Sequence, residues 1–171
     1  MKNISIKAMI PNMLTAGNLW LGILAIISAL EGDFKKACIF VIVAAFLDGM
    51  DGKAARKLNV SSEFGKELDS LCDMVSFGAA PGILAYTFFL NELGVAGLII
   101  SILFITAGAF RLARFNVLNI TTHFIGVPIT IAGGFLALVM LLGSNLSSLI
   151  IAAITFVLSY LMVSNIKTLK F

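Results

Sequence analysis

Four aspartates stand close together between two apolar segments of the chain, and their spacing suggests shared chemistry. They are Asp48, Asp51, Asp69 and Asp73. The window that they span holds six of the nine acidic residues of the chain. The first two are three residues apart and the last two are four apart, so on helices each pair occupies one face. A loop of about ten residues between the pairs lets two helices fold back side by side, and all four carboxylates can then converge.

Four converging carboxylates repel one another and are costly in an apolar surrounding. Protonation of some of them would relieve the repulsion, and bound cations would do so as well. Two divalent cations would neutralise the four charges, and ligation by oxygen alone suits Mg²⁺, Mn²⁺ or Ca²⁺ rather than zinc. Because two such ions about 3.5–4 Å apart form a clamp for phosphoryl transfer, we predict a pair of divalent cations, Mg²⁺ or Mn²⁺, at the four aspartates.

Residues beside the aspartates indicate room for a phosphate-bearing ligand. Gly52 and Ala55 follow the first aspartate pair at helical spacing, so this helix face carries almost no other side chain. Together with Gly65, these small residues leave space for a flat ligand near the backbone. Arg56 lies close by in the sequence, and its guanidinium can hold a phosphate through two hydrogen bonds.

The composition indicates a membrane environment. Of the 171 residues, 60% are hydrophobic and 12% are charged, whereas soluble domains carry roughly 25% charged residues. The net charge of +3 and the lack of a basic stripe with aromatics give no support for nucleic acid as a partner. The length fits a single domain over residues 1–171 and, at about 20 apolar residues per crossing, about six helices.

Six apolar segments predict the elements that must position the aspartates. They run roughly over residues 9–30, 34–57, 66–90, 94–116, 124–143 and 146–166. Backbone groups in hydrocarbon must be paired within the segment, and the apolar runs lack the alternation of barrel strands. We therefore predict an all-α integral membrane protein with six transmembrane helices, the aspartates lying on the second and third.

The lysines and arginines predict the orientation. With the N-terminus in the cytoplasm, ten of the twelve lie on the cytoplasmic side and only Lys35 and Lys36 lie on the other. Both termini are then cytoplasmic in a multi-pass protein of the cell membrane. Asp48 lies about ten residues inside the cytoplasmic end of its helix, which is roughly 15 Å at 1.5 Å per residue. We expect a polar cavity there, open to the cytoplasm and, sideways, to lipid.

Other polar residues in the predicted helices are candidates for substrate contacts. Thr15 and Asn18 share a face of the first helix and could line the nucleotide side of the cavity, or serve helix capping and packing. Arg111 and Arg114 share a face near the cytoplasmic end of the fourth helix, and Asn116 follows. One arginine could meet an anionic acceptor or the lipid phosphate, although the positive-inside rule alone would also explain both.

The remaining reactive or small residues are expected to serve packing. Cys38 and Cys72 are far apart and have neither disulfide nor metal-ligand spacing, so we expect both to be reduced packing residues. His123 is the only histidine and is expected to be solvated in a loop. Gly78 and Gly82 would let helix backbones approach closely.

The aspartate window resembles the signature of the CDP-alcohol phosphotransferase family, D-x2-D-G-x2-A-R-x8-G-x3-D-x3-D. Every fixed position is filled at the right spacing, by Asp48, Asp51, Gly52, Ala55, Arg56, Gly65, Asp69 and Asp73. Softer motifs resemble the branch of the family that uses serine. They are PNMLTAGN at 11–18, SFGAAPG at 76–82, RLARFN at 111–116 and GVPI at 126–129.

The resemblance implies a reaction and a role for each aspartate. The donor is CDP-diacylglycerol or an archaeal ether-lipid equivalent, the hydroxyl of L-serine attacks the lipid-side phosphorus, and CMP leaves. By the same resemblance, Asp48, Asp51 and Asp69 ligate the metal that grips the diphosphate. Asp73 contacts a second metal and acts as the general base. Members of the family are usually homodimers, so a homodimer is expected.

Three alternatives remain open on sequence alone. Glycerol phosphate or inositol phosphate could replace serine, because those acceptors also need an anion-binding pocket. A small cation transporter would also keep carboxylates within the membrane, although transporters tend to have midplane sites and internal repeats. A structural membrane protein with inert aspartates is disfavoured by the cost of burying them. The tails of the donor, ester or ether, are not distinguished.

Overall fold

The structure is a computed structural model that describes residues 6–58, 62–118, 124–164 and 167–168, with side chains described over 12–50, 62–117 and 126–164. The α-helices within these ranges are α1 (Ile6–Leu30), α2 (Phe34–Leu58), α3 (Glu63–Asp73), α4 (Ala80–Phe88), α5 (Val95–Leu118), α6 (Ile129–Leu142) and α7 (Ser148–Val163). A π-helical segment, η1 (Met74–Ala79), joins α3 to α4, and a 3-10 turn, η2 (Leu90–Leu93), precedes α5. Strands β1 (Phe124–Ile125) and β2 (Lys167–Thr168) pair antiparallel.

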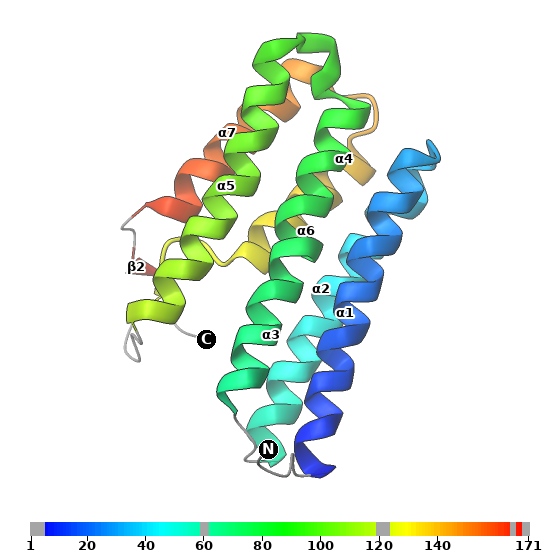
Figure 1. Cartoon of the computed structure of the whole chain (residues 1–171). Coiled ribbons are helices and arrows are strands. Elements are labelled where there is room, and N and C mark those ends of the chain that lie inside the picture. The colour runs from blue at the N-terminus through cyan, green and yellow to red at the C-terminus, as the bar shows by residue number, and fades with distance from the viewer. Residues whose placement is uncertain (1–5, 59–61, 119–123, 165–166, 169–171) are drawn as a thin grey trace.

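The helices form one bundle, in which several pairs that pack together are far apart in the sequence (Figure 1). α1 packs along the length of α2, and the continuous α3–η1–α4 helix packs against α1. α5 packs against α7 on the other side of the bundle, while α6 packs mainly on α2. The end of α2 and the start of α3 lie at the same end of the bundle, which brings the two halves of the aspartate window together.

The outer surface of the bundle is apolar, as expected of a membrane protein. Trp20, Phe46 and Leu142 are more than 70% exposed although they are large and apolar. Three helical stretches of the described chain are long and apolar enough to cross a membrane, Asn12–Leu30, Glu63–Phe88 and Val95–Val117, and α6 and α7 are shorter apolar helices. The all-helical membrane class is therefore confirmed, whereas the number of six crossings stays a prediction.

The third predicted helix begins earlier than expected and contains an irregular turn. Ser62 caps its start, because the backbone N–H of Gly65 donates to Ser62 Oγ over 3.0 Å. The π-helical segment η1 follows Asp73, and Pro81 lies in the first turn of α4. A proline has no N–H to donate to the carbonyl four residues back. Pro81 therefore accounts for the wider turn that precedes it.

Glycines let three helices close around this irregular turn. A Cβ on Gly22 of α1 would lie 2.8 Å from Ser76 Cα, and one on Gly133 of α6 would lie 2.8 Å from Phe77 Cα. One on Gly82 would lie 2.6 Å from Ile105 Cγ1 of α5, so the close helix packing expected there is confirmed. These contacts hold the backbone just after Asp73 between α1 and α6. Cys38 and Cys72 form no disulfide and both are buried, as predicted.

Candidate active site

Carboxylates from α2 and α3 come together at three of the four aspartates. One carboxylate oxygen from each of Asp48, Asp69 and Asp73 lies within 4.8 Å of the other two. Asp48 and Asp69 are half-buried, and Asp73, the last residue of α3, is only 8% exposed. The convergence expected from two helix pairs is thus present for these three residues, none of which is fully exposed.

The other signature residues on α2 fall where side chains are not described. Asp51, Gly52, Ala55 and Arg56 belong to α2, which is helical through Leu58, but their side chains lie outside the described residues. Asp51 follows Asp48 by three helical positions, as the sequence suggested. Its metal-binding role, and the phosphate-binding role of Arg56, stay predictions.

Gly65, the remaining small residue of the signature, lies in the first turn of α3. A Cβ there would approach Ser62 Oγ to 3.1 Å and Asn12 Oδ1 of α1 to 3.2 Å. The glycine therefore allows the first turn of α3 to pack tightly on α1. The room that it was expected to leave for a ligand stays a prediction.

The carboxylate cluster fits a divalent cation. Three carboxylate oxygens this close repel one another at a half-buried to buried site, and a cation removes that repulsion. The donors are all oxygens, which suits Mg²⁺ or Mn²⁺ and not a thiolate or imidazole metal. The charge of Arg111 also acts on Asp48 and Asp73, but a single guanidinium does not balance three carboxylates.

Asn18 of α1 is bonded directly to the cluster. Its side-chain Nδ2 donates to Asp73 Oδ1 over 3.3 Å, and its backbone carbonyl accepts a hydrogen bond of 3.0 Å from Ser76 Oγ. Thr15, three residues earlier on the same helix, is also buried. The nucleotide contacts expected of Thr15 and Asn18 stay predictions, and for Asn18 the structure adds a contact with the predicted base.

The two arginines of α5 lie in different surroundings. Arg111 is only 8% exposed, its Cζ lies 5.8 Å from the centroid of the Phe115 ring, and its Nε has no hydrogen-bond partner among the described residues. Arg114 donates to the carbonyl oxygens of Val163 and Ser164, each over 3.2 Å, at the C-terminal end of α7. Sequence treated the two alike, and only the fold separates them.

Asn116 ties α5 to α3. Its Nδ2 donates to Ser70 Oγ over 3.1 Å and to Glu67 Oε2 over 3.3 Å, and Ser70 Oγ donates back to its Oδ1 over 3.3 Å. Ser70 follows Asp69 directly, so this bridge holds the helix turn that carries two of the clustered carboxylates. The acceptor contact expected of Asn116 stays a prediction.

Two residues near the cluster were missed by the sequence reasoning. Thr130, in the first turn of α6, offers a hydrogen bond to the Asp48 carboxylate. Ser76 holds the backbone of Asn18. Both lie in or beside motifs that had been noted, Ser76 inside the segment 76–82 and Thr130 directly after 126–129. Their hydroxyls were the available signal, but which helix each would face depended on the packing.

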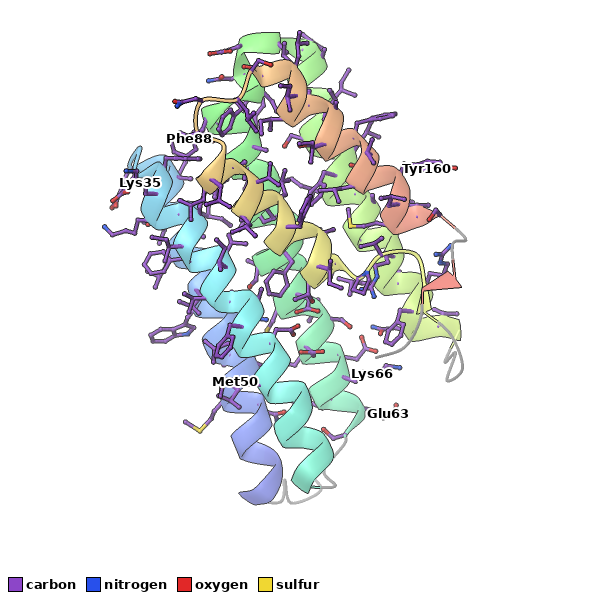
Figure 2. All side chains as sticks on the ribbon, turned by 180° about the vertical axis from the view of Figure 1, so that it is seen from behind. Lys35, Met50, Glu63, Lys66, Phe88 and Tyr160 are labelled. Carbon is purple, nitrogen blue, oxygen red and sulfur yellow. The ribbon has the colours of Figure 1, made fainter. Side chains whose placement is uncertain are left out.

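The site lies in the half of the bundle that contains the end of α2 and the start of α3. Figure 2 shows Glu63 and Lys66 at the start of α3 and Met50 on α2 toward the same end, whereas Lys35 and Phe88 lie together at the other. Tyr160 points outward from α7, away from both. A cluster of oxygen ligands between two helices of an apolar bundle defines a membrane protein with a candidate divalent-cation site toward one of its ends.

Comparison with known proteins identifies the family. The family model described as CDP-alcohol phosphatidyltransferase matches residues 8–163, which is most of the chain. This chain therefore belongs to the CDP-alcohol phosphatidyltransferase family, as the signature in the aspartate window indicated.

Named relatives cover nearly the whole chain. It is 43% identical over 159 residues to a CDP-diacylglycerol–serine O-phosphatidyltransferase of Bacillus subtilis, covering 92% of this chain and 88% of that protein. It is 40% identical over 167 residues to an enzyme of the same name from Helicobacter pylori, covering 92% and 70%. An archaetidylserine synthase of Methanothermobacter thermautotrophicus is 35% identical over 170 residues, covering 97% and 72%.

Proposed function

We propose that this chain transfers the phosphatidyl group of CDP-diacylglycerol, or of an archaeal ether-lipid equivalent, to the hydroxyl of L-serine and releases CMP. The observation that carries the proposal is the convergence of Asp48, Asp69 and Asp73 in a chain of this family. Relatives named for phosphatidyl transfer to serine and for archaetidylserine synthesis support the acceptor. These names are compatible with an ester-lipid donor and with an ether-lipid donor.

The four aspartates of the window would hold two divalent cations, Mg²⁺ or Mn²⁺. The close approach of three of their carboxylates supports this arrangement. When bound, such cations neutralise the diphosphate and stabilise the charge that develops on the leaving CMP. The protein's own part is to keep the carboxylates at fixed positions on two helices that both pack against α1, so that little reorganisation is needed during the reaction.

Asp73 would act as the general base. Its carboxylate accepts the proton of the serine hydroxyl while the hydroxyl oxygen forms a bond to the lipid-side phosphorus. The bond between that phosphorus and the oxygen of CMP breaks, CMP leaves with the electron pair, and the proton passes from Asp73 to water. The burial of Asp73 and its hydrogen bond from Asn18 support a fixed orientation for this carboxylate.

Substrate contacts are proposed for two further groups of residues. The nucleotide and diphosphate would meet Gly52, Ala55, Arg56 and Gly65, with Thr15 and Asn18 on the facing helix. The carboxylate of serine would meet Arg111, because this guanidinium is buried near Asp48 and Asp73 and its Nε has no partner among the described residues. Arg114 and Asn116, which lie close to Arg111 on α5, would help to position the serine carboxylate.

The membrane topology is also a proposal. Ten of the twelve basic residues favour a cytoplasmic face for the end of the bundle that carries the site, with six crossings and both termini cytoplasmic. A homodimer is proposed from the family resemblance. The large exposed apolar side chains on several helices would be covered by lipid or, in part, by a second copy.

The test is release of CMP by the purified protein. CDP-diacylglycerol and Mg²⁺ or Mn²⁺ are supplied with serine, glycerol 3-phosphate or inositol 1-phosphate in turn. We expect release with serine only, and none after EDTA. Release with another acceptor would keep the aspartate chemistry and overturn the assignment to serine. No release with any acceptor, for ester and ether donors alike, would contradict the proposed reaction.

A further inference from the structure

A buried amide on α1 holds the carboxylate that the proposed function uses as its base. Asn18 has no exposed surface, and its Nδ2 donates to Asp73 Oδ1 over 3.3 Å across a sequence separation of 55 residues. An amide N–H donated to one oxygen of a carboxylate fixes the direction in which the group points. Because both residues are buried, water does not compete for this bond as it would at the surface.

Asn18 is itself held in place by the helical segment that follows Asp73. Ser76, which has no exposed surface, donates its Oγ hydrogen to the backbone carbonyl of Asn18 over 3.0 Å. Gly22, one helical turn after Asn18, allows this approach, because a Cβ there would lie 2.8 Å from Ser76 Cα. Asp73 thus bonds to the side chain of Asn18, and Ser76 bonds to its backbone.

The backbone between these two contacts is irregular. Asp73 ends α3, and Ser76 lies within the π-helical segment Met74–Ala79. Asp73 and Ser76 are three residues apart, and both side chains bond to Asn18. Isolated π-helical turns are uncommon and occur frequently at functional sites.

Asn18 also carries a cost that packing alone does not explain. Its side-chain Oδ1 is buried and has no hydrogen-bond partner among the described residues. A buried acceptor without a partner destabilises a fold, and an apolar side chain of the same size would avoid the cost. The presence of an asparagine at this position is therefore explained by its Nδ2 group, which donates to Asp73.

We propose that Asn18 is a positioning residue that orients the Asp73 carboxylate for proton transfer, with Ser76 holding Asn18 in register. The proposal rests on the proposed function, in which Asp73 is the base. For Asn18 it is an alternative to the nucleotide contact given under the proposed function, and the two roles differ in their kinetic effect. A positioning residue acts on the turnover rate, whereas a nucleotide contact that is equally strong before and during reaction acts on KM.

The test is the Asn18→Leu variant of the full-length protein in detergent, which removes the donor and keeps the size of the side chain. We expect kcat to fall roughly 10- to 100-fold, the usual effect of losing a group that orients a site carboxylate. KM for CDP-diacylglycerol and serine should stay within about twofold. The melting temperature should change by no more than about 4 °C. Binding of Mn²⁺ alone, followed by electron paramagnetic resonance, should persist and weaken no more than kcat does, because Asp48 and Asp69 keep their surroundings.

Ser28→Ala is the matched control, because Ser28 is also buried on α1 and lies far along the helix from Asp73. It should leave kcat, KM and Mn²⁺ binding as in the wild type. Wild-type kcat in Asn18→Leu would overturn the proposal, and so would a raised KM for CDP-diacylglycerol at unchanged kcat. Loss of Mn²⁺ binding in Asn18→Leu would also overturn it, since Asn18 would then shape the metal site.

Should Asn18→Leu fail to fold, Ser76→Ala decides the question. A severalfold lower kcat at unchanged KM would support the proposal, and a wild-type kcat would overturn it. Failure of the proposed function is seen separately, because the wild-type protein would then release no CMP with serine.

Discussion

The two ends of the bundle both carry carboxylates, and their surroundings differ. At the end that holds the α1–α2 turn, Asp33 Oδ2 lies 3.4 Å from Lys36 Nζ, and the two side chains are 46% and 55% exposed. Asp33 Oδ1 also accepts a hydrogen bond from the backbone N–H of Lys36 at the start of α2. Toward the other end, Asp48 and Asp69 are half-buried and Asp73 is buried, and one carboxylate oxygen of each lies within 4.8 Å of the other two.

The contrast separates a structural carboxylate from a chemical one. Asp33 satisfies a free N–H at a helix start and pairs with a lysine in water, which accounts fully for its presence. Three converging carboxylates at a half-buried site lower the stability of the fold unless something binds them. Acidic residues in a membrane chain therefore become informative through convergence and burial rather than through number.

The largest expected effect comes from removing the proposed base. Asp73→Asn keeps the size of the side chain but cannot accept the serine proton, so CMP release should fall at least about 100-fold. The fold should persist, because one of three repelling charges is removed. Release assays and thermal unfolding in detergent check both statements. Activity close to that of the wild type would show that the proton leaves by another route.

Cation binding should distinguish the two ends next most clearly. Mg²⁺ or Mn²⁺ should raise the melting temperature, because a ligand bound only by the folded state stabilises it, by about 2.7 kcal/mol at 100 times its dissociation constant. Asp48→Asn should lose most of this shift and Asp33→Asn should keep it. An equal shift in both variants would mean that the cations act elsewhere.

Arg111 provides an intermediate test. Arg111→Gln removes the charge proposed to meet the serine carboxylate, and a hydrogen bond to a charged group contributes about 1.5–3 kcal/mol. KM for serine should therefore rise about tenfold or more, with a smaller change for CDP-diacylglycerol. Arg114→Gln, which removes the contacts with the end of α7, should lower the melting temperature more than it raises KM for serine. If Arg114→Gln raised KM for serine more than Arg111→Gln did, Arg114 would be the residue that meets the serine carboxylate.

The smallest effect is expected at the far end. Asp33→Asn breaks an exposed ion pair, which contributes at most about 1 kcal/mol, and asparagine still caps a helix. CMP release should be unchanged and the melting temperature should shift by a few degrees at most. A large loss of activity would remove the distinction between the two ends, since a solvated carboxylate would then matter to the reaction.

Much of the bundle follows from local pattern. Apolar runs bounded by charged or turn residues predicted the helices, because a backbone in hydrocarbon must pair its own hydrogen-bonding groups. The start of α3 was placed at residue 66, whereas its true start depends on the Ser62 cap and lies three residues earlier. The π-helical segment was not predicted. Pro81 follows it in the first turn of α4, and glycines of α1 and α6 pack against it.

The candidate site divides in the same way. The spacing of the aspartates determined that each pair shares a helix face, and their types determined that the ligands are oxygens, because helical periodicity and donor chemistry are local properties. Which residues serve those carboxylates was decided by tertiary structure alone. Asn18 meets Asp73 and Thr130 approaches Asp48 only because α1 and α6 pack where close glycine contacts allow. Contacts between distant segments depend on the packing of whole helices, which no spacing along one helix records.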